Sequence, residues 1–420
     1  MKVCVIGNGG REHALAWRLS ISPSVTKVYA IPGSAAMSDC AELVGIDWQQ
    51  SDHLISFLKD NQVDLVVVGP EAPLVAGLAD TLNKAGIPVF GPSKAAAQLE
   101  GSKVFAKDLM KKYNIPTAAY GVFHKVDEAK EFISQTGAPI VVKADGLAAG
   151  KGVVVAMTIE EANAAVEDML SGNRFGEAGS TVVIEEFMEG EEASLLAFVD
   201  GKTVVPMIAS QDHKRIFDGD KGPNTGGMGT YAPAPVLTDA LRDEAMKTIL
   251  EPMVAAMEKE GMPYVGCLYA GLMITPQGPK VVEFNARFGD PETQVVLPLL
   301  DSDLGQIMMA CATGTLTADM VKWKDSSAAC VILASKGYPE TSSKGDVIHG
   351  DIKQHDTTIV FHSGTKLIGD EYVTNGGRVL GVVGLGKDLR TALDRAYGRI
   401  EHIDFEGMQY RTDIGAKAFK

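Results

Sequence analysis

Short apolar runs alternate with helical patterns along the first hundred residues of the chain. Each run ends in a glycine or proline turn. This repetition predicts a parallel sheet with helices on both faces, and in such sheets ligands bind at the carboxyl ends of the strands. The expected strands are Lys2–Ile6, Lys27–Ile31, Asp64–Gly69 and Pro88–Phe90, and the expected helices are Arg11–Ser20, His53–Asn61 and Gly77–Ala85.

The pattern changes after Gly101 and again after Lys324. A small α+β unit follows first, then longer strands around a loop-rich stretch at 210–235, and finally a smaller β-rich unit. We therefore expect a multidomain α/β and α+β chain with units at 1–101, 102–324 and 325–420. The expected strands are Gly121–Phe123, Ile140–Lys143, Thr181–Glu186, Ala193–Val199, Val204–Ile208, Cys267–Ile274, Lys280–Asn285, Ala328–Ala334, Thr358–Phe361 and Arg378–Val383; the expected helices are Ser102–Tyr113, Asp127–Thr136, Ile159–Leu170, Asp239–Glu260 and Leu389–Ile400.

Composition and charge narrow the function classes. The chain has 420 residues, 45% of them hydrophobic, and a formal net charge of −15. A nucleic-acid-binding protein usually carries a basic surface, so this balance argues against that class. No apolar run approaches the ~18 residues of a membrane helix. The five widely spaced cysteines lack a C-x-x-C pair and indicate buried thiols in a reducing compartment. We expect a cytoplasmic protein with no nucleic-acid or membrane partner.

The loop after the first strand begins as a dinucleotide-binding loop does. Gly7 and Gly9 fit the G-x-G-x-x-G pattern, but the third position holds Glu12. The acidic residue expected after the second strand is also missing, so the loop is a weak nicotinamide site. The backbone N–H groups of Gly9, Gly10 and Arg11 are suited to one phosphate at a helix N-terminus, and a plain tight turn is the alternative.

A second glycine loop lies in "VVKADGLAAGKGVVVA". This segment places Lys143 at the end of a strand and Lys151 between Gly150 and Gly152. Because Gly152 stands where a Walker A loop has Ser or Thr, the loop does not belong to that class. Backbone N–H groups and lysine ammonium groups nevertheless predict a phosphate-binding loop.

The segment "VVEFNARFGDPETQ" has the pattern of a metal site. Glu283 and Asn285 are two residues apart on an expected strand, so their side chains share one face, and Arg287 continues that face. Two oxygen ligands, with the other positions left to water and phosphate, suit Mg²⁺ at a nucleotide. A buried Glu and Asn with no ion between them would be costly, which favours the metal site.

A further segment, "VVIEEFMEGEE", ends an expected strand. Two interpretations are open for it: an edge that holds adenine and ribose, or a solvated acidic turn. The residues concerned are Glu185, Glu186, Phe187 and Glu191.

Taken together, these segments resemble the ATP-grasp ligases, and most closely the family of phosphoribosylamine–glycine ligases. The resemblance rests on "GNGGREHALA", "VVGPEAPLVAG", "KADGLAAGKGVVVA", "DHKRIFDGDKGPNTGGMGTYAPAP", "LYAGLM" and "EFNARFGDPETQ", which span nearly the whole chain. It implies an N-terminal domain, an ATP-grasp domain with a small lid at about 121–188, and a C-terminal domain. It also implies ATP with Mg²⁺ or Mn²⁺, and ligation of glycine to 5-phosphoribosylamine through a glycyl phosphate.

The resemblance assigns roles to residues, with Lys143, Lys151, Arg287 and Asp290 in the chemistry. Glycine is expected at Asp290, and Glu283 and Asn285 are the expected metal ligands, although "LYAGLM" lacks the acidic ligand that many ATP-grasp enzymes carry there. The expected nucleotide-binding residues are Lys103, Lys143, Gly150, Lys151, Gly152, Glu185, Glu186, Phe187, Glu191 and Asn285; the expected substrate-binding residues are Gly9, Gly10, Arg11, Glu12, Gly33, Pro70, Glu71, Asp212, Lys214, Asn224, Thr225, Gly226, Gly227 and Asp290.

Two alternatives stand beside this hypothesis. One is a different ATP-grasp ligase or carboxylase, because the amino-acid substrate is not readable from motif spacing. The other is a nucleotide-binding oxidoreductase, against which Glu12 argues directly. For His13 and His213 two interpretations are equally open, a hydrogen-bonding role and a catalytic role. We expect small-molecule substrates and a monomer.

Overall fold

The N-terminal residues form a five-stranded parallel sheet in the order β3-β2-β1-β4-β5. The computed structural model describes residues 1–147, 152–171 and 176–420. Side chains of β1 alternate between two apolar clusters, with Val3 and Val5 in one and Cys4 and Ile6 in the other, so both faces of the sheet are buried as expected. The strands are β1 Lys2–Gly7, β2 Lys27–Pro32, β3 Glu42–Leu43, β4 Leu65–Val68 and β5 Val89–Phe90; the helices are α1 Gly10–Ser20, η1 Ala35–Asp39, α2 Ser51–Asp60, α3 Glu71–Ala76 and α4 Leu78–Lys84.

Two helices that the sequence pattern did not predict complete this unit. Helices α11 (Thr293–Leu299) and α12 (Leu304–Thr313) pack against α1 and β5. Every residue of α11 is buried and the helix contains Pro298. A short helix that is buried on all sides has no polar face and therefore shows no 3.6-residue period, which explains why the sequence did not indicate it.

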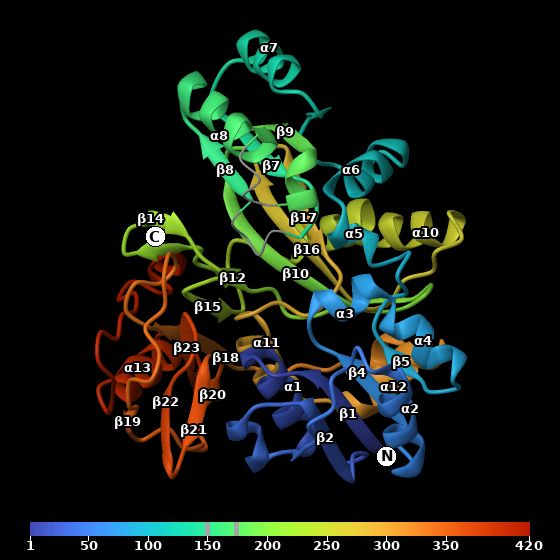
Figure 1. Cartoon of the computed structure of the whole chain (residues 1–420), viewed down its shortest axis with the longest axis vertical. Coiled ribbons are helices and arrows are strands. Elements are labelled where there is room, and N and C mark those ends of the chain that lie inside the picture. Colours follow the sequence, from blue (N-terminus) through green and yellow to red (C-terminus); the bar gives the residue numbers. More distant parts are fainter. Residues whose placement is uncertain (148–151, 172–175) are drawn as a thin grey trace.

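A small unit of four strands in the order β6-β9-β7-β8 lies at the top of Figure 1. Its two helices pack on the sheet around a separate apolar cluster that includes Ile133, Val142 and Ile184. The predicted strands and helices of this unit are all present. They are β6 Tyr120–Phe123, α7 Val126–Thr136, β7 Ile140–Ala144, β8 Val153–Ala156, α8 Ile159–Ser171, η2 Gly176–Ser180 and β9 Val182–Glu186.

The central sheet is antiparallel, in the order β11-β10-β16-β17, and its helices pack on one apolar cluster. The helix expected at 239–260 is α9, a π-helical turn η3 and α10 in succession. The elements are α5 Gln98–Gly101, α6 Lys103–Lys112, β10 Glu191–Asp200, β11 Val204–Pro206, α9 Asp239–Ala245, η3 Met246–Leu250, α10 Glu251–Lys259, β16 Val265–Thr275 and β17 Gly278–Asn285.

The stretch expected to be loop-rich, 210–235, contributes strands to the C-terminal sheet. That sheet has the order β12-β15-β18-β23-β20, so the C-terminal unit is completed by residues far earlier in the chain. The elements are β12 Gln211–Asp212, β13 Arg215–Phe217, β14 Lys221–Asn224, β15 Gly229–Ala232, η4 Ala318–Met320, β18 Ser327–Ala334, β19 His349–Gly350, β20 Thr358–His362, β21 Thr365–Ile368, β22 Glu371–Thr374, β23 Arg378–Gly386, α13 Leu389–Ile400, β24 Ile403–Asp404 and η5 Ala416–Phe419.

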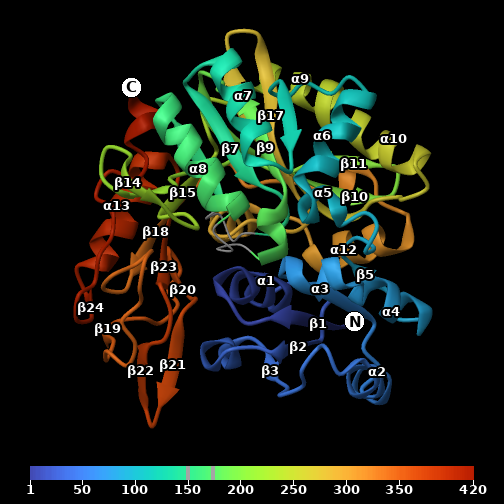
Figure 2. The same ribbon diagram turned by 45° about the horizontal axis from the view of Figure 1, so that its top comes forward.

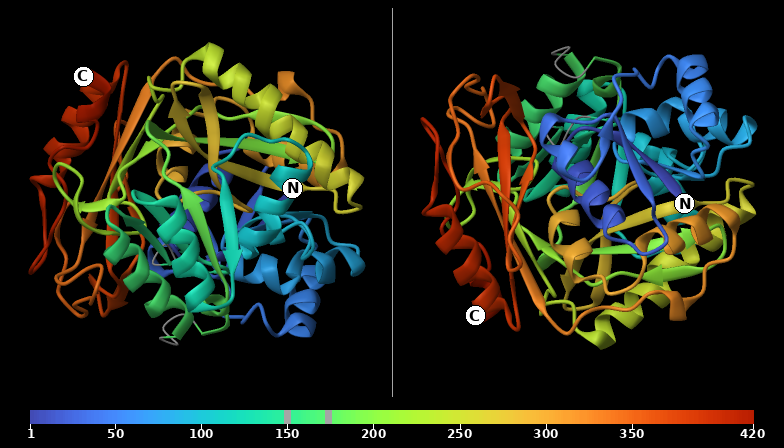
Figure 3. Two further views of the ribbon diagram at one scale, coloured as in Figure 1. Left: turned by 90° about the horizontal axis from the view of Figure 1, so that it is seen from above. Right: turned by 90° about the horizontal axis from the view of Figure 1, so that it is seen from below.

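The units meet around the ends of β1 and β17. With the top of the molecule turned forward, α7 and α8 lie above α1, and the C-terminal sheet lies to the left (Figure 2). Views from above and below show the C-terminal unit along one flank of the molecule (Figure 3). Among the described residues, no helix combines the length and the apolar character that a membrane crossing requires.

Candidate active site

The loop between β1 and α1 is shaped around the carboxylate of Glu12, which is only 2% exposed. One oxygen accepts the N–H of Gly9 at 2.8 Å and so satisfies the backbone donor that precedes the first turn of the helix. The other oxygen accepts Arg11 Nε at 2.5 Å. A Cβ at Gly69 would overlap this carboxylate, so Gly69 leaves the room that Glu12 occupies.

The expected phosphate cradle at this helix is therefore partly occupied within the protein. The N–H of Gly9 donates to Glu12, and the N–H of Arg11 donates to Asp290 Oδ2 at 3.3 Å. Gly33 N–H donates to Gly7 O at 3.2 Å and ties β2 to the same loop. Beside the loop, at the carboxyl ends of β1, β2 and β4, a hollow of about 440 Å³ is lined by Gly7, Asn8, Pro32, Gly45, Ile46, Asp47, Trp48 and Pro70.

Arg287 links the N-terminal unit to the central sheet. Its Nε donates to Glu71 at 3.3 Å and its Nη2 donates to Glu100 at 2.7 Å. Nη2 also lies 3.4 Å from Asn285 Oδ1. Burial opposes its charge, but Glu100 and Glu71 outweigh burial and raise the pKa of Arg287. Burial raises the pKa of Glu100, and Arg287 opposes that rise. Arg287 is thus charged and held between two carboxylates.

Glu283 and Asn285 share one face of β17, as the sequence predicts. Asn285 Nδ2 lies 3.5 Å from Glu283 Oε1. Burial acts to raise the pKa of Glu283, but the ammonium groups of Lys214, Lys143 and Lys103 lower it by more. The net pKa is below the ordinary value, so the carboxylate is ionised. Gly271 pairs with Glu283 on the neighbouring strand and offers no ligand. The amide oxygen of Asn285 faces Arg287, so rotation of the amide would place an oxygen beside the ionised carboxylate, and that donor set suits a hard divalent cation.

Lysine ammonium groups surround this pair from the small unit and from α6. Lys143 Nζ lies 3.0 Å from Glu185 Oε2 and donates to Val282 O at 3.2 Å. Lys103 Nζ donates to Gly146 O at 2.9 Å. Gly150 and Lys151 lie outside the described residues, and Gly152, which is buried, begins the return into β8.

The acidic segment at the end of β9 divides into buried and exposed residues. Glu185 is 2% exposed, and its Oε1 has no hydrogen-bond partner among the described residues. Glu186 is exposed and accepts the N–H of Ala119 at 3.3 Å. Glu191 accepts Gln211 Nε2 at 3.2 Å. Phe187 is half-buried.

The expected substrate loop is held by its own hydrogen bonds. Lys214 Nζ donates to Glu192 at 2.8 Å. Thr225 donates to Lys214 O at 2.8 Å and accepts the N–H of Gly227 at 3.0 Å. Burial and the nearby Glu292 raise the pKa of Asp212, which lies against Gly227. Asn224 pairs with Arg215 in the β13–β14 hairpin.

Arg378 on β23 joins this loop to Asp290, and sequence reasoning missed it. Its Nη1 donates to Gly226 O at 3.0 Å and to Asp290 O at 2.8 Å. The Asp290 carboxylate also accepts Gln294 Nε2 at 2.8 Å. Arg378 follows two glycines at the start of a strand, and nothing in that local pattern points to a site 88 residues earlier.

Several other charged residues near the site were also missed. Glu292 accepts Tyr269 OH at 2.7 Å within the motif that carried the resemblance, so the motif itself held the signal. Glu192 ends the segment "VVIEEFMEGEE", in which its neighbour Glu191 was assigned a role, whereas Glu100 lies in a segment without a recognisable pattern.

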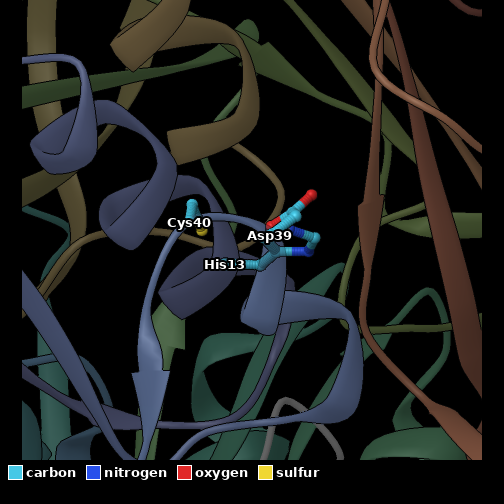
Figure 4. A group of neighbouring side chains, drawn as sticks. All are labelled: His13, Asp39 and Cys40. Atoms are coloured by element: carbon cyan, nitrogen blue, oxygen red, sulfur yellow. The ribbon is translucent and has the colours of Figure 1, made fainter.

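His13 on α1, together with Asp39 and Cys40 at the end of η1, forms a group of potential metal ligands (Figure 4). His13 Nδ1 accepts the backbone N–H of His362 at 3.0 Å, and Nε2 lies 3.6 Å from Asp39 Oδ1. Because Nδ1 accepts a hydrogen bond, the proton of the neutral ring is on Nε2, which then has no lone pair for a metal. His13 therefore joins the N-terminal unit to β20. His213 Nδ1 lies 3.1 Å from Gly229 O, so both histidines make hydrogen bonds to the backbone, which favours the hydrogen-bonding interpretation of the two that the sequence left open.

Comparison with known proteins covers nearly the whole chain. Family models described as Phosphoribosylglycinamide synthetase match in three parts: the N domain at 1–100, the ATP-grasp (A) domain at 101–293 and the C domain at 328–417. A phosphoribosylamine–glycine ligase from Halalkalibacterium halodurans is 53% identical over 418 residues, covering 100% of this chain and 97% of the relative.

Solved structures agree in fold. The crystal structure of a phosphoribosylamine–glycine ligase from Thermotoga maritima has a TM-score of 0.86 and 34% identity, with 99% of this chain and 100% of that chain covered. The biotin carboxylase domain of the Hydrogenobacter thermophilus 2-oxoglutarate carboxylase has a TM-score of 0.75 at 17% identity, covering 97% and 91% of the two chains, and shows the fold alone. The chain belongs to the phosphoribosylglycinamide synthetase family, the ATP-dependent phosphoribosylamine–glycine ligases of purine biosynthesis.

Proposed function

We propose that the chain activates glycine as glycyl phosphate with ATP and that the amine of 5-phospho-D-ribosylamine then attacks the acyl carbon. The products are glycinamide ribonucleotide, ADP and phosphate. The observation that carries the proposal is Arg287, which contacts Glu71 of the N-terminal unit and lies 3.4 Å from Asn285 on β17. The sugar-phosphate side and the nucleotide side thus meet at one residue. We further propose that the enzyme acts as a cytoplasmic monomer with units at 1–101, 102–324 and 325–420.

The nucleotide side is assigned to the small unit and the central sheet. Lys103, Lys143 and Lys151, with the N–H groups around Gly150 and Gly152, supply positive charge to the phosphates. The end of β9 supplies the adenosine contacts through Glu185, Glu186, Phe187 and Glu191. Only cations and positioned donors are required, because phosphoryl transfer spreads charge over the phosphate oxygens without a covalent protein intermediate.

Glu283 and Asn285 would hold a divalent cation at this site, and we propose Mg²⁺ or Mn²⁺. Such an ion neutralises charge on the phosphate oxygens when bound. The ionised carboxylate of Glu283 and the amide of Asn285 fit a hard cation once the amide turns its oxygen, which now lies 3.4 Å from Arg287 Nη2, toward the ion. Phosphate and water would supply the remaining ligands. This donor set needs no further acidic residue on β16.

Glycine is assigned to the space bounded by Asp290 and Asp212, where a carboxylate accepts its ammonium group. Asn224, Thr225, Gly226 and Gly227 form the wall that separates it from the nucleotide. The ammonium-binding role of Asp290 requires an ionised carboxylate. Burial acts to raise the pKa of Asp290, but Arg378 and Arg11 lower it by more, so the net pKa is below the ordinary value.

Phosphoribosylamine is assigned to the carboxyl edge of the N-terminal sheet, near Gly9, Gly10, Gly33 and Pro70. The hollow beside Gly7 and Asn8 gives the sugar phosphate room. Arg11 lies between two carboxylates. Its Nη1 lies 3.8 Å from Glu71 Oε2, and its Nε contacts Glu12 Oε1 at 2.5 Å. Glu12 thus acts on the substrate by fixing the loop and Arg11.

The reaction is tested by measuring ADP release with each substrate omitted in turn. We expect ADP to form one-for-one with glycinamide ribonucleotide only when ATP, a divalent cation, glycine and phosphoribosylamine are all present. The competing assignment is a carboxylase, since the fold is shared with biotin carboxylase domains. Equal turnover with bicarbonate or alanine in place of glycine would refute the proposal.

The same assay tests the sugar-phosphate site through Gly9→Val. A Cβ at Gly9 would lie 2.9 Å from Glu12 Oε2, so the larger side chain displaces the carboxylate that shapes the loop. We expect the KM for phosphoribosylamine to rise by about tenfold or more, while the KM for ATP stays within about twofold. The opposite pattern would mean that the two glycine loops have exchanged roles. Gly398→Val, at an exposed position of α13 where a Cβ would meet no atom within 4 Å, is the matched control for the added side chain.

A further inference from the structure

Lys107 is a buried charge that the proposed reaction does not use. It lies on α6, four residues after Lys103, and its side chain is 3% exposed. Its Nζ lies 3.1 Å from Glu185 Oε2 and donates to Thr117 Oγ1 at 2.7 Å. The ammonium also lies 5.8 Å from the centre of the Tyr120 ring. An ion pair this deeply buried is costly to form, and a hydrophobic side chain of similar volume would avoid that cost.

Two lysines share one oxygen of Glu185. Lys143 Nζ lies 3.0 Å from the same Oε2 that Lys107 contacts. Lys107 has a second firm partner in Thr117, which in turn donates to Val281 O at 2.7 Å. Among the described residues, the second partner of Lys143 is Val282 O alone, at the longer distance of 3.2 Å. Lys107 is therefore the better anchored of the two cations, and Lys143 is the one that can move.

We propose that Lys107 is a positioning residue for Lys143, an inference that rests on the proposed function, in which Lys143 meets the phosphates of ATP. Lys107 neutralises Glu185, so Lys143 is not needed as its counter-ion and its ammonium is free to contact the phosphates. Without Lys107, Glu185 has Lys143 as its remaining close cation, and the nucleotide has to compete with Glu185 for it.

The charge state of Lys107 supplies a second way to remove its effect. Burial lowers its pKa to about 8, although Glu185 opposes the shift. A lysine with this pKa is charged below pH 8 and becomes neutral as the pH rises through that value. The groups that face it are Glu185 on β9, Lys143 on β7 and Tyr120 on β6. Burial also lowers the pKa of Lys103, on which the charges of Lys143 and Glu185 act as well. A change of pH alone would therefore not distinguish Lys107 from Lys103, and the test uses substitutions of Lys107 for this purpose.

The experiment measures the affinity of the full-length protein for ATP and for adenosine by calorimetry, without glycine or phosphoribosylamine. Lys107→Met is expected to weaken ATP binding about tenfold and to leave adenosine binding unchanged, because only the phosphates compete for Lys143. Lys107→Arg is expected to restore ATP binding. In the double variant with Lys143→Met, loss of Lys107 is expected to add nothing further. Lys111→Met, an exposed lysine on the same helix, is the matched control for loss of one charge.

The outcomes separate this inference from the proposed function. Unchanged ATP affinity in Lys143→Met would overturn the assignment of Lys143 itself. The role of Lys107 alone would be overturned if Lys143→Met weakened ATP binding while Lys107→Met did not. It would also be overturned if the two losses of ATP affinity added in the double variant. If Lys107→Met does not fold, the wild type and Lys107→Arg are compared between about pH 7 and pH 9.5. We expect the ratio of ATP to adenosine affinity to fall more steeply with pH in the wild type than in Lys107→Arg, because both proteins keep Lys103, and an equal fall in both proteins would overturn the inference.

Discussion

Replacing Glu283 with alanine is expected to lower turnover by about a thousandfold, within the range seen when one preorganised electrostatic group is removed from an active site. Glu283 is the one anionic member of the proposed metal pair, and Lys214, Lys143 and Lys103 hold it ionised. Its loss removes a ligand of the divalent cation and leaves three ammonium groups without their shared carboxylate. The metal concentration for half-maximal rate is expected to rise as well.

Glu283→Ala is measured by ADP release across a series of Mg²⁺ and Mn²⁺ concentrations, with thermal unfolding as a check on the fold. Glu251→Ala removes an exposed carboxylate from α10, which packs with the same central cluster, and serves as the matched control. We expect that control to behave as the wild type. Unaltered metal dependence in folded Glu283→Ala would assign Glu283 a purely structural role.

Arg287→Met is expected to lower the free energy of unfolding by about 3–5 kcal/mol, because it leaves buried carboxylates without their cation. Glu100 has a side chain that is 7% exposed and accepts Arg287 Nη2 at 2.7 Å. Glu71, on the N-terminal unit, loses its contact with Arg287 Nε at 3.3 Å. Activity is expected to fall too, since the same guanidinium lies beside Asn285.

The stability loss of Arg287→Met is expected to depend on pH in a definite direction. In the wild type, burial raises the pKa of Glu71, but Arg287 and Arg11 outweigh it and lower the value. A carboxyl with a lowered pKa contributes stability at neutral pH that is lost as the pH falls through its folded value. The variant lacks that contribution and protonates Glu71 and Glu100 more readily.

The contribution of Glu71 persists down to the ordinary carboxyl pKa of 4.5 and is lost below it, so the difference between wild type and variant in urea unfolding is expected to be larger at pH 7 than at pH 4. Arg242→Met provides the control, because Arg242 pairs only with exposed Asp239 and Asp243 and such surface pairs contribute little. A pH-independent difference for Arg287→Met would attribute the effect to lost packing instead of lost charge.

The regular elements of the chain were predictable where one physical pattern dominated. Strands β1, β2, β4 and β5 and helix α1 follow from apolar runs and punctuating turns, and the parallel sheet follows from their alternation. Helix α11 was not predictable in this way because all its residues are buried. Strand β15 lies in a glycine-rich stretch, and its partner β18 begins about a hundred residues later, so no local pattern indicates the pairing.

The candidate site was predictable to the extent that its residues are close in sequence. Glu283 and Asn285 face one side because a strand alternates, and the structure has this arrangement. The structure differs at Glu12 from what the glycine loop alone predicts. The N–H of Gly9, which the pattern makes available to a phosphate, donates to the Glu12 carboxylate instead. Arg378 and Lys107 were missed because their contacts come from tertiary packing between separate units.

The central claim is that glycine is activated as an acyl phosphate before the amine attacks. Supplying glycine labelled with ¹⁸O in its carboxylate, together with Mg²⁺, ATP and phosphoribosylamine, tests it directly by mass spectrometry of the released phosphate. The proposed route transfers one labelled oxygen to phosphate for each glycinamide ribonucleotide formed. Phosphate without label, released at the same rate as product, would contradict the glycyl phosphate and with it the proposed reaction.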